Sequence, residues 1–154
     1  MKKPRILLAD DHPAILNALC GLLENGVGKV VGTVEDGEAL LEEAQRLKPD
    51  IIITDISMPK LSGLKATRAL QHTVPQSKVI ILTGHCEPAY VTLAFQAGAR
   101  GYLLKRTSLH AELSQAVRHV LAGDWYIGHG VRVGEEWAFA GEGESLIRNS
   151  PVRG

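Results

Sequence analysis

Five short apolar segments recur along the first two thirds of the chain, and in each of them the apolar residues run almost without interruption. A strand with one wet face alternates between apolar and polar residues, whereas a strand covered on both faces does not. The segments span residues 5–9, 29–34, 50–54, 78–83 and 101–104. The pattern therefore predicts five strands buried within a sheet.

Between these segments, apolar residues recur at every third or fourth position, which is typical of helices with one apolar face. The apolar stripes lie within residues 15–23, 40–47, 64–70, 90–97 and 109–121. Asp11, Asp36 and Ser62 stand where a helix would begin, and Gly98 and Gly123 stand where one would end. The alternation predicts an α/β fold: a doubly wound, five-stranded parallel sheet in the order 2-1-3-4-5, with five helices on its two faces, as in flavodoxin-like proteins.

The last part of the chain does not continue this pattern. Seven of the 32 residues from 123 to 154 are glycine, and the aromatic residues follow neither a strand nor a helix period. We therefore expect a first domain over residues 4–122, followed by an irregular, glycine-rich tail over residues 123–154. A short helix near residues 142–148 is a further expectation for this tail.

Composition narrows the function classes. The 154 residues include 17 Lys and Arg and 17 Asp and Glu, so the formal net charge is zero. This balance argues against a chain-wide basic field for nucleic acid or an anionic membrane, although a local patch remains compatible with it. The two cysteines, Cys20 and Cys86, suit free thiols in a reducing compartment. No apolar run approaches the ~18 residues of a membrane span, and the apolar start is too short for a signal peptide, so we expect a cytoplasmic protein.

Acidic residues stand at the ends of two predicted strands that lie side by side. Asp10 and Asp11 follow the first strand and Asp55 follows the third, while Thr83 and Lys105 end the fourth and fifth. The carboxyl ends of parallel strands share one edge of the sheet, and ligands bind there where the strand order reverses. All five side chains are therefore expected at one crevice.

Three carboxylates in one crevice repel each other unless a cation lies between them. Oxygen ligands at an open site suit Mg²⁺. A nearby lysine and threonine would suit a phosphoryl group, and an aspartate can be the nucleophile that forms an acyl phosphate.

These residues also carry a family pattern. The motifs are Asp-Asp-His at 10–12, Asp-Ile-Ser-Met-Pro at 55–59 with Gly63, Thr-Gly-His at 83–85 and Gly-Tyr-Leu-Leu-Lys at 101–105. Over about residues 4–122 the chain resembles the response regulator receiver domain of two-component systems. Residues 10–13 and 97–105 resemble the NarL/FixJ branch in particular.

The resemblance implies a role for each matching residue. Asp55 would be the phosphoacceptor, and Mg²⁺ would be held by Asp10, Asp11, Asp55 and the backbone carbonyl of Ser57.

The resemblance also implies a switch. Lys105 would contact the phosphoryl group, Thr83 would move towards it, and Tyr102 would change its rotamer in response. From its position alone, Tyr102 is either a core residue or a half-exposed residue near the end of an edge strand. His85, two residues after Thr83, is either an ordinary loop residue or a neighbour of the crevice. The output face would comprise helix 4, strand 5 and helix 5.

The implied partner is a sensor histidine kinase or a phosphotransfer protein, and a phosphorylation-dependent homodimer is a further expectation. The chain would catalyse only its own phosphorylation and dephosphorylation and would not otherwise be an enzyme. NarL/FixJ regulators continue into a helix-turn-helix domain, for which residues 123–154 are too few and too rich in glycine. We therefore expect no direct DNA binding and no membrane contact from this chain, whether it is a stand-alone receiver, a trimmed chain or a truncated gene product.

Three alternatives keep parts of this pattern. A phosphatase of the haloacid-dehalogenase type would need Asp-x-Asp on the first strand and an inserted cap, and neither is present. A flavin or nucleotide carrier would need a phosphate-binding loop after the first strand, where residues 10–13 are acidic instead. In the third, the receiver fold remains and the tail binds a partner, with Trp125, Trp137 and Phe139 as anchors.

Overall fold

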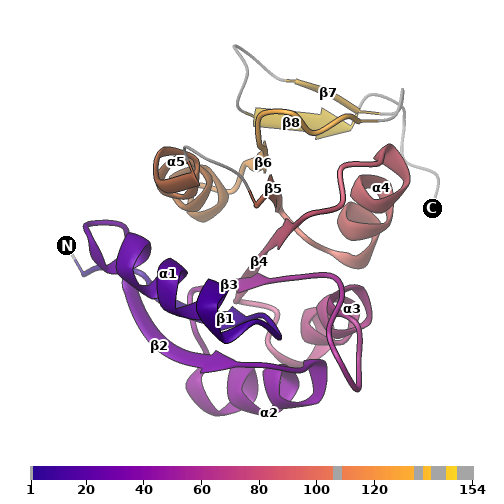
Figure 1. Ribbon diagram of the computed structural model, residues 1–154. Coiled ribbons are helices and arrows are strands. Elements are labelled where there is room, and N and C mark those ends of the chain that lie inside the picture. Colours follow the sequence, from indigo (N-terminus) through magenta and orange to yellow (C-terminus); the bar gives the residue numbers. More distant parts are fainter. Residues whose placement is uncertain (1, 106–108, 134–136, 140–144, 149–154) are drawn as a thin grey trace.

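The computed structural model describes residues 2–105, 109–133, 137–139 and 145–148 (Figure 1). The strands of its first part are β1 (Arg5–Ala9), β2 (Lys29–Val34), β3 (Ile51–Thr54), β4 (Lys78–Thr83) and β5 (Gly101–Leu104). The helices are α1 (Pro13–Glu24), α2 (Gly37–Leu47), α3 (Gly63–Thr73), α4 (Pro88–Ala97) and α5 (Leu109–Leu121). Within the described residues, no helix is long and apolar enough to span a bilayer.

The sheet has the order predicted from the sequence, β2-β1-β3-β4-β5, and all its neighbours in this part run parallel. Helices α1 and α5 lie on one side of the sheet, and α2, α3 and α4 lie on the other (Figure 1). The doubly wound α/β fold is therefore confirmed.

Each face of the sheet has its own apolar core, because successive side chains of a strand point to opposite faces. Ile6 and Leu8 of β1 pack with residues of α1 and α5. Leu7 and Ala9 of the same strand pack with residues of α2, α3 and α4. This double coverage explains why the central strands read as unbroken apolar runs. Strand β2 is the exception, since it lies at the edge of the sheet and most of its residues are partly exposed.

Of the three residues predicted to begin a helix, two are N-cap residues. The Asp36 carboxylate accepts a hydrogen bond from the Ala39 N–H at 2.8 Å, and the Ser62 hydroxyl accepts one from the Lys65 N–H at 3.2 Å. The prediction for Asp11 is wrong: α1 is preceded by His12, whose side chain makes no capping bond. Pro13, which opens α1, has no N–H, and the His12 backbone carbonyl accepts the Ile15 N–H at 3.0 Å.

Three segments within the predicted irregular tail are strands. Strand β6 (Trp125–Ile127) pairs in parallel with β5, β8 (Ser145–Arg148) pairs antiparallel with β6, and β7 (Trp137–Phe139) pairs with β8. Where a helix was expected near residues 142–148, the described part, residues 145–148, is a strand. Strands of three or four residues are too short to show a period, and their pairing with distant residues determines them. Tail residues 134–136, 140–144 and 149–154 lie outside the described ranges.

Candidate functional site

The predicted crevice forms at the carboxyl ends of β1 and β3. These strands pair in register, with Ala9 opposite Thr54, and the Asp55 N–H donates to the Ala9 carbonyl at 3.1 Å. Asp10 and Asp55, the next residue on each strand, therefore lie side by side. Both are nearly buried, with 1% and 6% exposure. Ligand atoms of Asp10, Asp11, His12 and Asp55 all lie within 4.8 Å of one another.

Lys105 lies between two of the carboxylates. Its Nζ is 2.7 Å from Asp10 Oδ2 and 2.7 Å from Asp55 Oδ2. Burial lowers the pKa of Lys105, but the hydrogen bonds to Asp10 and Asp55 and the negative charges of both carboxylates together raise it by more, so the pKa is above its ordinary value. The ammonium therefore stays charged and offsets one of three formal negative charges. Two remain, which is the charge that a divalent cation would balance.

Asp11 supplies an oxygen that has no hydrogen-bond partner among the described residues. Its Oδ1 is buried and accepts no hydrogen bond from any described residue. His12 Nδ1 lies 3.0 Å away, but this contact lacks hydrogen-bond geometry, whereas the same Nδ1 bonds to Asp10 Oδ1 at 3.0 Å. A buried acceptor is costly unless something binds it. An oxygen-lined site with an orphaned oxygen and surplus negative charge fits a hard metal cation.

His12 is the residue that the sequence reasoning did not include in the site. Its backbone N–H also donates to Asp10 Oδ1, at 2.9 Å. The only signal for it was its position directly after the acidic pair.

A tight loop follows Asp55. The Gly63 N–H donates to the Ile56 carbonyl at 2.7 Å, which folds the start of α3 against the site. A Cβ on Gly63 would lie 1.8 Å from the Asp55 carbonyl oxygen, so only glycine fits. The Ile56 N–H donates to Asp55 Oδ1 at 2.6 Å and orients the carboxylate. The role of the Ser57 carbonyl as a metal ligand stays a prediction.

His85 connects the crevice to Tyr102. Its Nε2 lies 3.3 Å from the Ser57 hydroxyl, and its carbonyl accepts the Tyr102 hydroxyl at 2.7 Å. Its backbone N–H donates to the hydroxyl of Thr83, which is fully buried, at 3.3 Å. His85 also stacks on Tyr90, with ring centroids 4.3 Å apart. A continuous set of contacts thus links Ser57, Thr83 and Tyr102.

Tyr102 is a core residue. Its exposure is 0%, because β6 pairs beyond β5 and β5 is therefore not the edge strand that a half-exposed Tyr102 would require. Burial, followed by the negative charge of Glu87, raises the pKa of Tyr102 well above its ordinary value. The phenol therefore remains a neutral hydrogen-bond donor.

The chain matches known proteins over the same region. Residues 6–118 match the response regulator receiver domain family. The response regulator GacA of Pseudomonas viridiflava is 41% identical over 124 residues, which are 80% of this chain and 58% of that protein. The chain thus spans little more than half the length of curated relatives such as this one.

Solved structures are similar to the same part of the chain. The signal receiver domain of a NarL regulator from Mycobacterium tuberculosis is 33% identical, with a TM-score of 0.75 over 80% of this chain and 99% of that one. The isolated receiver domain of RcsB from Salmonella enterica, solved in the presence of the phosphomimetic BeF₃⁻, is 27% identical, with a TM-score of 0.76 over 84% and 96% of the two chains. The family match, the fold and the acidic crevice agree: this chain belongs to the response regulator receiver family.

Proposed function

We propose that Asp55 of this receiver accepts a phosphoryl group from a phosphohistidine on a sensor kinase or a phosphotransfer protein, in a Mg²⁺-dependent reaction. The observation that carries the proposal is the ion pair between the nearly buried Asp55 carboxylate and Lys105, next to the carboxylates of Asp10 and Asp11. A carboxylate in this setting is both oriented and charged, as a nucleophile must be.

In this reaction the P–N bond of the phosphohistidine breaks and a P–O bond to Asp55 forms, while the imidazole nitrogen retains the electron pair. Asp55 Oδ1 is held by the Ile56 N–H at 2.6 Å, whereas Oδ2 contacts the flexible ammonium of Lys105 at 2.7 Å. We expect Oδ2 to attack, and Lys105 to turn from it to the phosphoryl oxygens. Phosphoryl transfer depends mainly on such positioning and charge neutralisation.

Asp10, Asp11, Asp55 and the Ser57 carbonyl would hold Mg²⁺. Bound there, the metal would neutralise charge on the phosphoryl oxygens as the transfer proceeds. The orphaned Asp11 Oδ1 and the two uncompensated negative charges support this assignment.

We further propose that Thr83 and Tyr102 report phosphorylation to the face made by α4, β5 and α5. The contacts through His85 support such a link. Tyr102 also carries the link onwards, because its carbonyl accepts the Gly128 N–H at 2.9 Å, directly after β6. The segment from β6 onwards would therefore move with the switch.

A phosphorylation-dependent homodimer through this face remains part of the proposal. Strands β6, β8 and β7 extend the sheet beyond β5. A second copy would therefore contact α4 and α5 rather than the edge of β5. In the family context, the output would regulate transcription.

Intact-mass spectrometry after incubation with acetyl phosphate and Mg²⁺ tests the proposal. Wild type should gain one phosphoryl group, and Asp55→Asn should gain none, because an amide oxygen is a poor nucleophile. Asp124→Asn, at an exposed aspartate remote from the crevice, is the matched control and should react like wild type. An equal adduct on Asp55→Asn, or an equal yield with the metal removed by EDTA, would contradict the proposal.

A further inference from the structure

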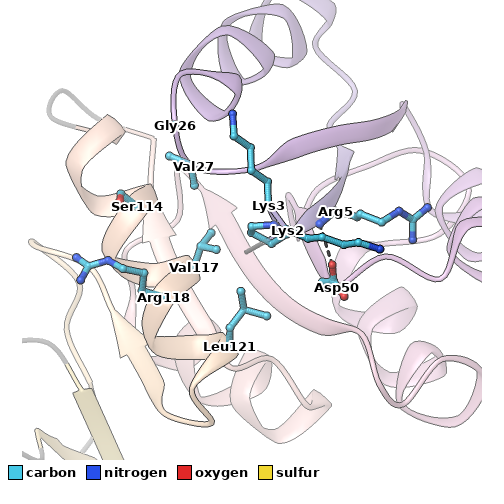
Figure 2. Close-up of a pocket in the computed structure, with 11 residues that line it drawn as sticks. Lys2, Lys3, Arg5, Gly26, Val27, Asp50, Ser114, Val117, Arg118 and Leu121 are labelled. Atoms are coloured by element: carbon cyan, nitrogen blue, oxygen red, sulfur yellow. Dashed lines mark hydrogen bonds between the residues drawn. The ribbon is translucent and has the colours of Figure 1, made fainter.

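A second hollow lies at the opposite edge of the sheet, where the strands begin (Figure 2). Its volume is about 530 Å³, and it is lined by the N-terminal segment, the turn after α1, and α5. Arg5 opens β1 and Asp50 directly precedes β3, so the hollow and the acidic crevice occupy opposite ends of the same strands. The two sites share no residue.

The rim of the hollow carries surplus positive charge. The side chains of Lys2, Lys3 and Arg118 form no hydrogen bond or ion pair with any residue in the described part of the chain, and all three residues are exposed. In Figure 2 Lys2 and Lys3 extend from the N-terminal segment, and Arg118 extends outwards from α5 on the other side of the hollow. Asp50 is the one carboxylate in the lining, and its Oδ2 accepts the Arg5 backbone N–H at 2.8 Å. The chain as a whole has zero net charge, so this surplus is a local feature.

Arg5 does not add to the free charge, although it lines the hollow. Its guanidinium donates to the Leu47 carbonyl at 2.8 Å and to the Lys48 carbonyl at 3.1 Å, at the end of α2. In Figure 2 it points away from the centre. Among the residues that line the hollow, the side chains available to pair with a ligand are therefore those of Lys2, Lys3 and Arg118.

The centre of the hollow is apolar. Val27, Val117 and Leu121 lie together there (Figure 2). Leu121 is 44% exposed, which makes it one of only two large apolar side chains that are exposed among the described residues. A single exposed leucine on a convex surface needs no explanation, but one inside a hollow that Lys2, Lys3 and Arg118 also line resembles the wall of a ligand site.

We propose that this hollow binds a small amphipathic anion, with an apolar body of alkyl type and one carboxylate or phosphate group. The body would cover Leu121 and Val27, and the anionic group would pair with Arg118 or the N-terminal lysines. A small inorganic anion would leave Leu121 exposed, whereas a neutral alkyl compound would leave the cations unpaired. The volume lies within the range of about 300–1,000 Å³ that is usual for small-molecule sites. The proposal does not depend on the chemistry of Asp55.

Titration of the ¹⁵N-labelled full chain, followed by NMR, tests the proposal with five probes. Octanoate and octyl phosphate should each give saturable shifts at the amides of Val27, Val117, Arg118 and Leu121, and the tighter of the two identifies the preferred anionic group. Acetate and inorganic phosphate, which lack the apolar body, should give no saturable shift there. Octanol, which lacks the charge, should bind about fivefold more weakly or worse.

Matched variants separate specific binding from general adsorption. Leu121→Asn should lower the affinity for octanoate about tenfold. Leu93→Asn, at a leucine of almost equal exposure on α4, should leave this affinity unchanged. Arg118→Ala should weaken it by about fivefold, whereas Arg68→Ala, at an exposed arginine of α3, should not. No saturable shift with either octyl anion, octanol binding as tightly as octanoate, or equal losses in test and control variants would overturn the proposal.

Discussion

Asp11 differs from its two acidic neighbours in a way that makes it the best probe of the metal site. Its side chain is 32% exposed, against 2% for Asp10 and 7% for Asp55. A substitution at Asp11 therefore disturbs the core least. It also changes the one buried carboxylate oxygen of the crevice that lacks a hydrogen-bond partner in the described structure.

Asp11→Asn should lower Mg²⁺ affinity by about tenfold or more, because it removes both charge and a strong oxygen ligand. Without metal it should be as stable as wild type or slightly more so, because repulsion within the crevice falls. Calorimetric Mg²⁺ titration and thermal unfolding with and without Mg²⁺ measure the two effects. Asp124→Asn serves as the control. Unchanged Mg²⁺ affinity in Asp11→Asn would remove this residue from the site.

Tyr102→Phe should reduce the dependence of stability on alkaline pH. Burial and Glu87 raise the pKa of Tyr102, so above about pH 10 the tyrosine ionises in the unfolded chain but not in the folded one. The contribution of Tyr102 to the free energy of unfolding is complete below pH 10. Above pH 10 this contribution falls by about 1.4 kcal/mol per pH unit. The raised pKa of Lys105 acts in the same direction, but it is common to both proteins and cancels in the comparison.

Urea unfolding at pH 8 and pH 11 measures this difference. At pH 8 the variant should lose about 1 kcal/mol with the hydrogen bond to the His85 carbonyl, and by pH 11 the gap should narrow. Tyr90→Phe, at a more exposed tyrosine, should keep the pH dependence of wild type. If wild type and Tyr102→Phe lost the same unfolding free energy between pH 8 and pH 11, Tyr102 would not be buried as described.

At the scale of the elements, two glycines in helices should respond in opposite ways to alanine. Gly63→Ala at the start of α3 places a Cβ against the Asp55 backbone and should destabilise the protein by about 2 kcal/mol or more. Gly21→Ala lies on the exposed side of α1 with nothing within 4 Å, and should stabilise by about 0.5–1 kcal/mol. Chemical denaturation measures both. A neutral Gly63→Ala would contradict the tight loop after Asp55.

The elements of the first part could be predicted because local pattern and final environment agree. Residues 79–82 are all apolar, and β4 is buried between β3 and β5. The acidic crevice followed from strand order alone, since Asp10 and Asp55 each stand one residue beyond a predicted strand. The direct bonds from Lys105 to both carboxylates could not be predicted, because side-chain direction depends on tertiary packing.

The tail could not be predicted for a different reason. Strand β6 has three residues, and its place depends on contacts with residues more than twenty positions away. Trp125 stacks on Phe95 at 5.9 Å, and the Arg100 guanidinium lies 5.7 Å from its ring and donates to the Gly123 carbonyl at 2.6 Å. Such contacts leave no period in the sequence, whereas glycine content misleadingly indicates irregular structure.

At the scale of the whole molecule, Trp125→Ala should test whether the extension of the sheet belongs to the folded unit. Loss of the packing on Phe95 and Arg100 should destabilise the protein by about 2 kcal/mol. Leu93→Ala, at an exposed position of the neighbouring α4, should change stability by less than about 0.5 kcal/mol. Urea unfolding measures both. Equal stability of Trp125→Ala and wild type would mean that β6 contributes nothing to the fold.

The molecule as a whole is neutral, but its charges are separated along the strands. The carboxyl ends carry the acidic crevice with Lys105, and the amino ends carry the exposed cations Lys2, Lys3 and Arg118. The two ends of one small sheet would therefore bind different ligands: a metal ion and a phosphoryl group at the carboxyl ends, and the proposed amphipathic anion at the amino ends.

Trapping of the acyl phosphate tests the central proposal most directly. Wild-type protein is incubated with acetyl phosphate and Mg²⁺, reduced with borohydride, which converts an aspartyl phosphate to homoserine, and mapped by peptide mass spectrometry. We predict homoserine at position 55 and at no other aspartate, because Asp55 alone combines burial with contacts to Lys105 and the Ile56 N–H. Homoserine at Asp10 or Asp11, or no homoserine at all in protein that binds Mg²⁺, would contradict the proposed phosphoacceptor.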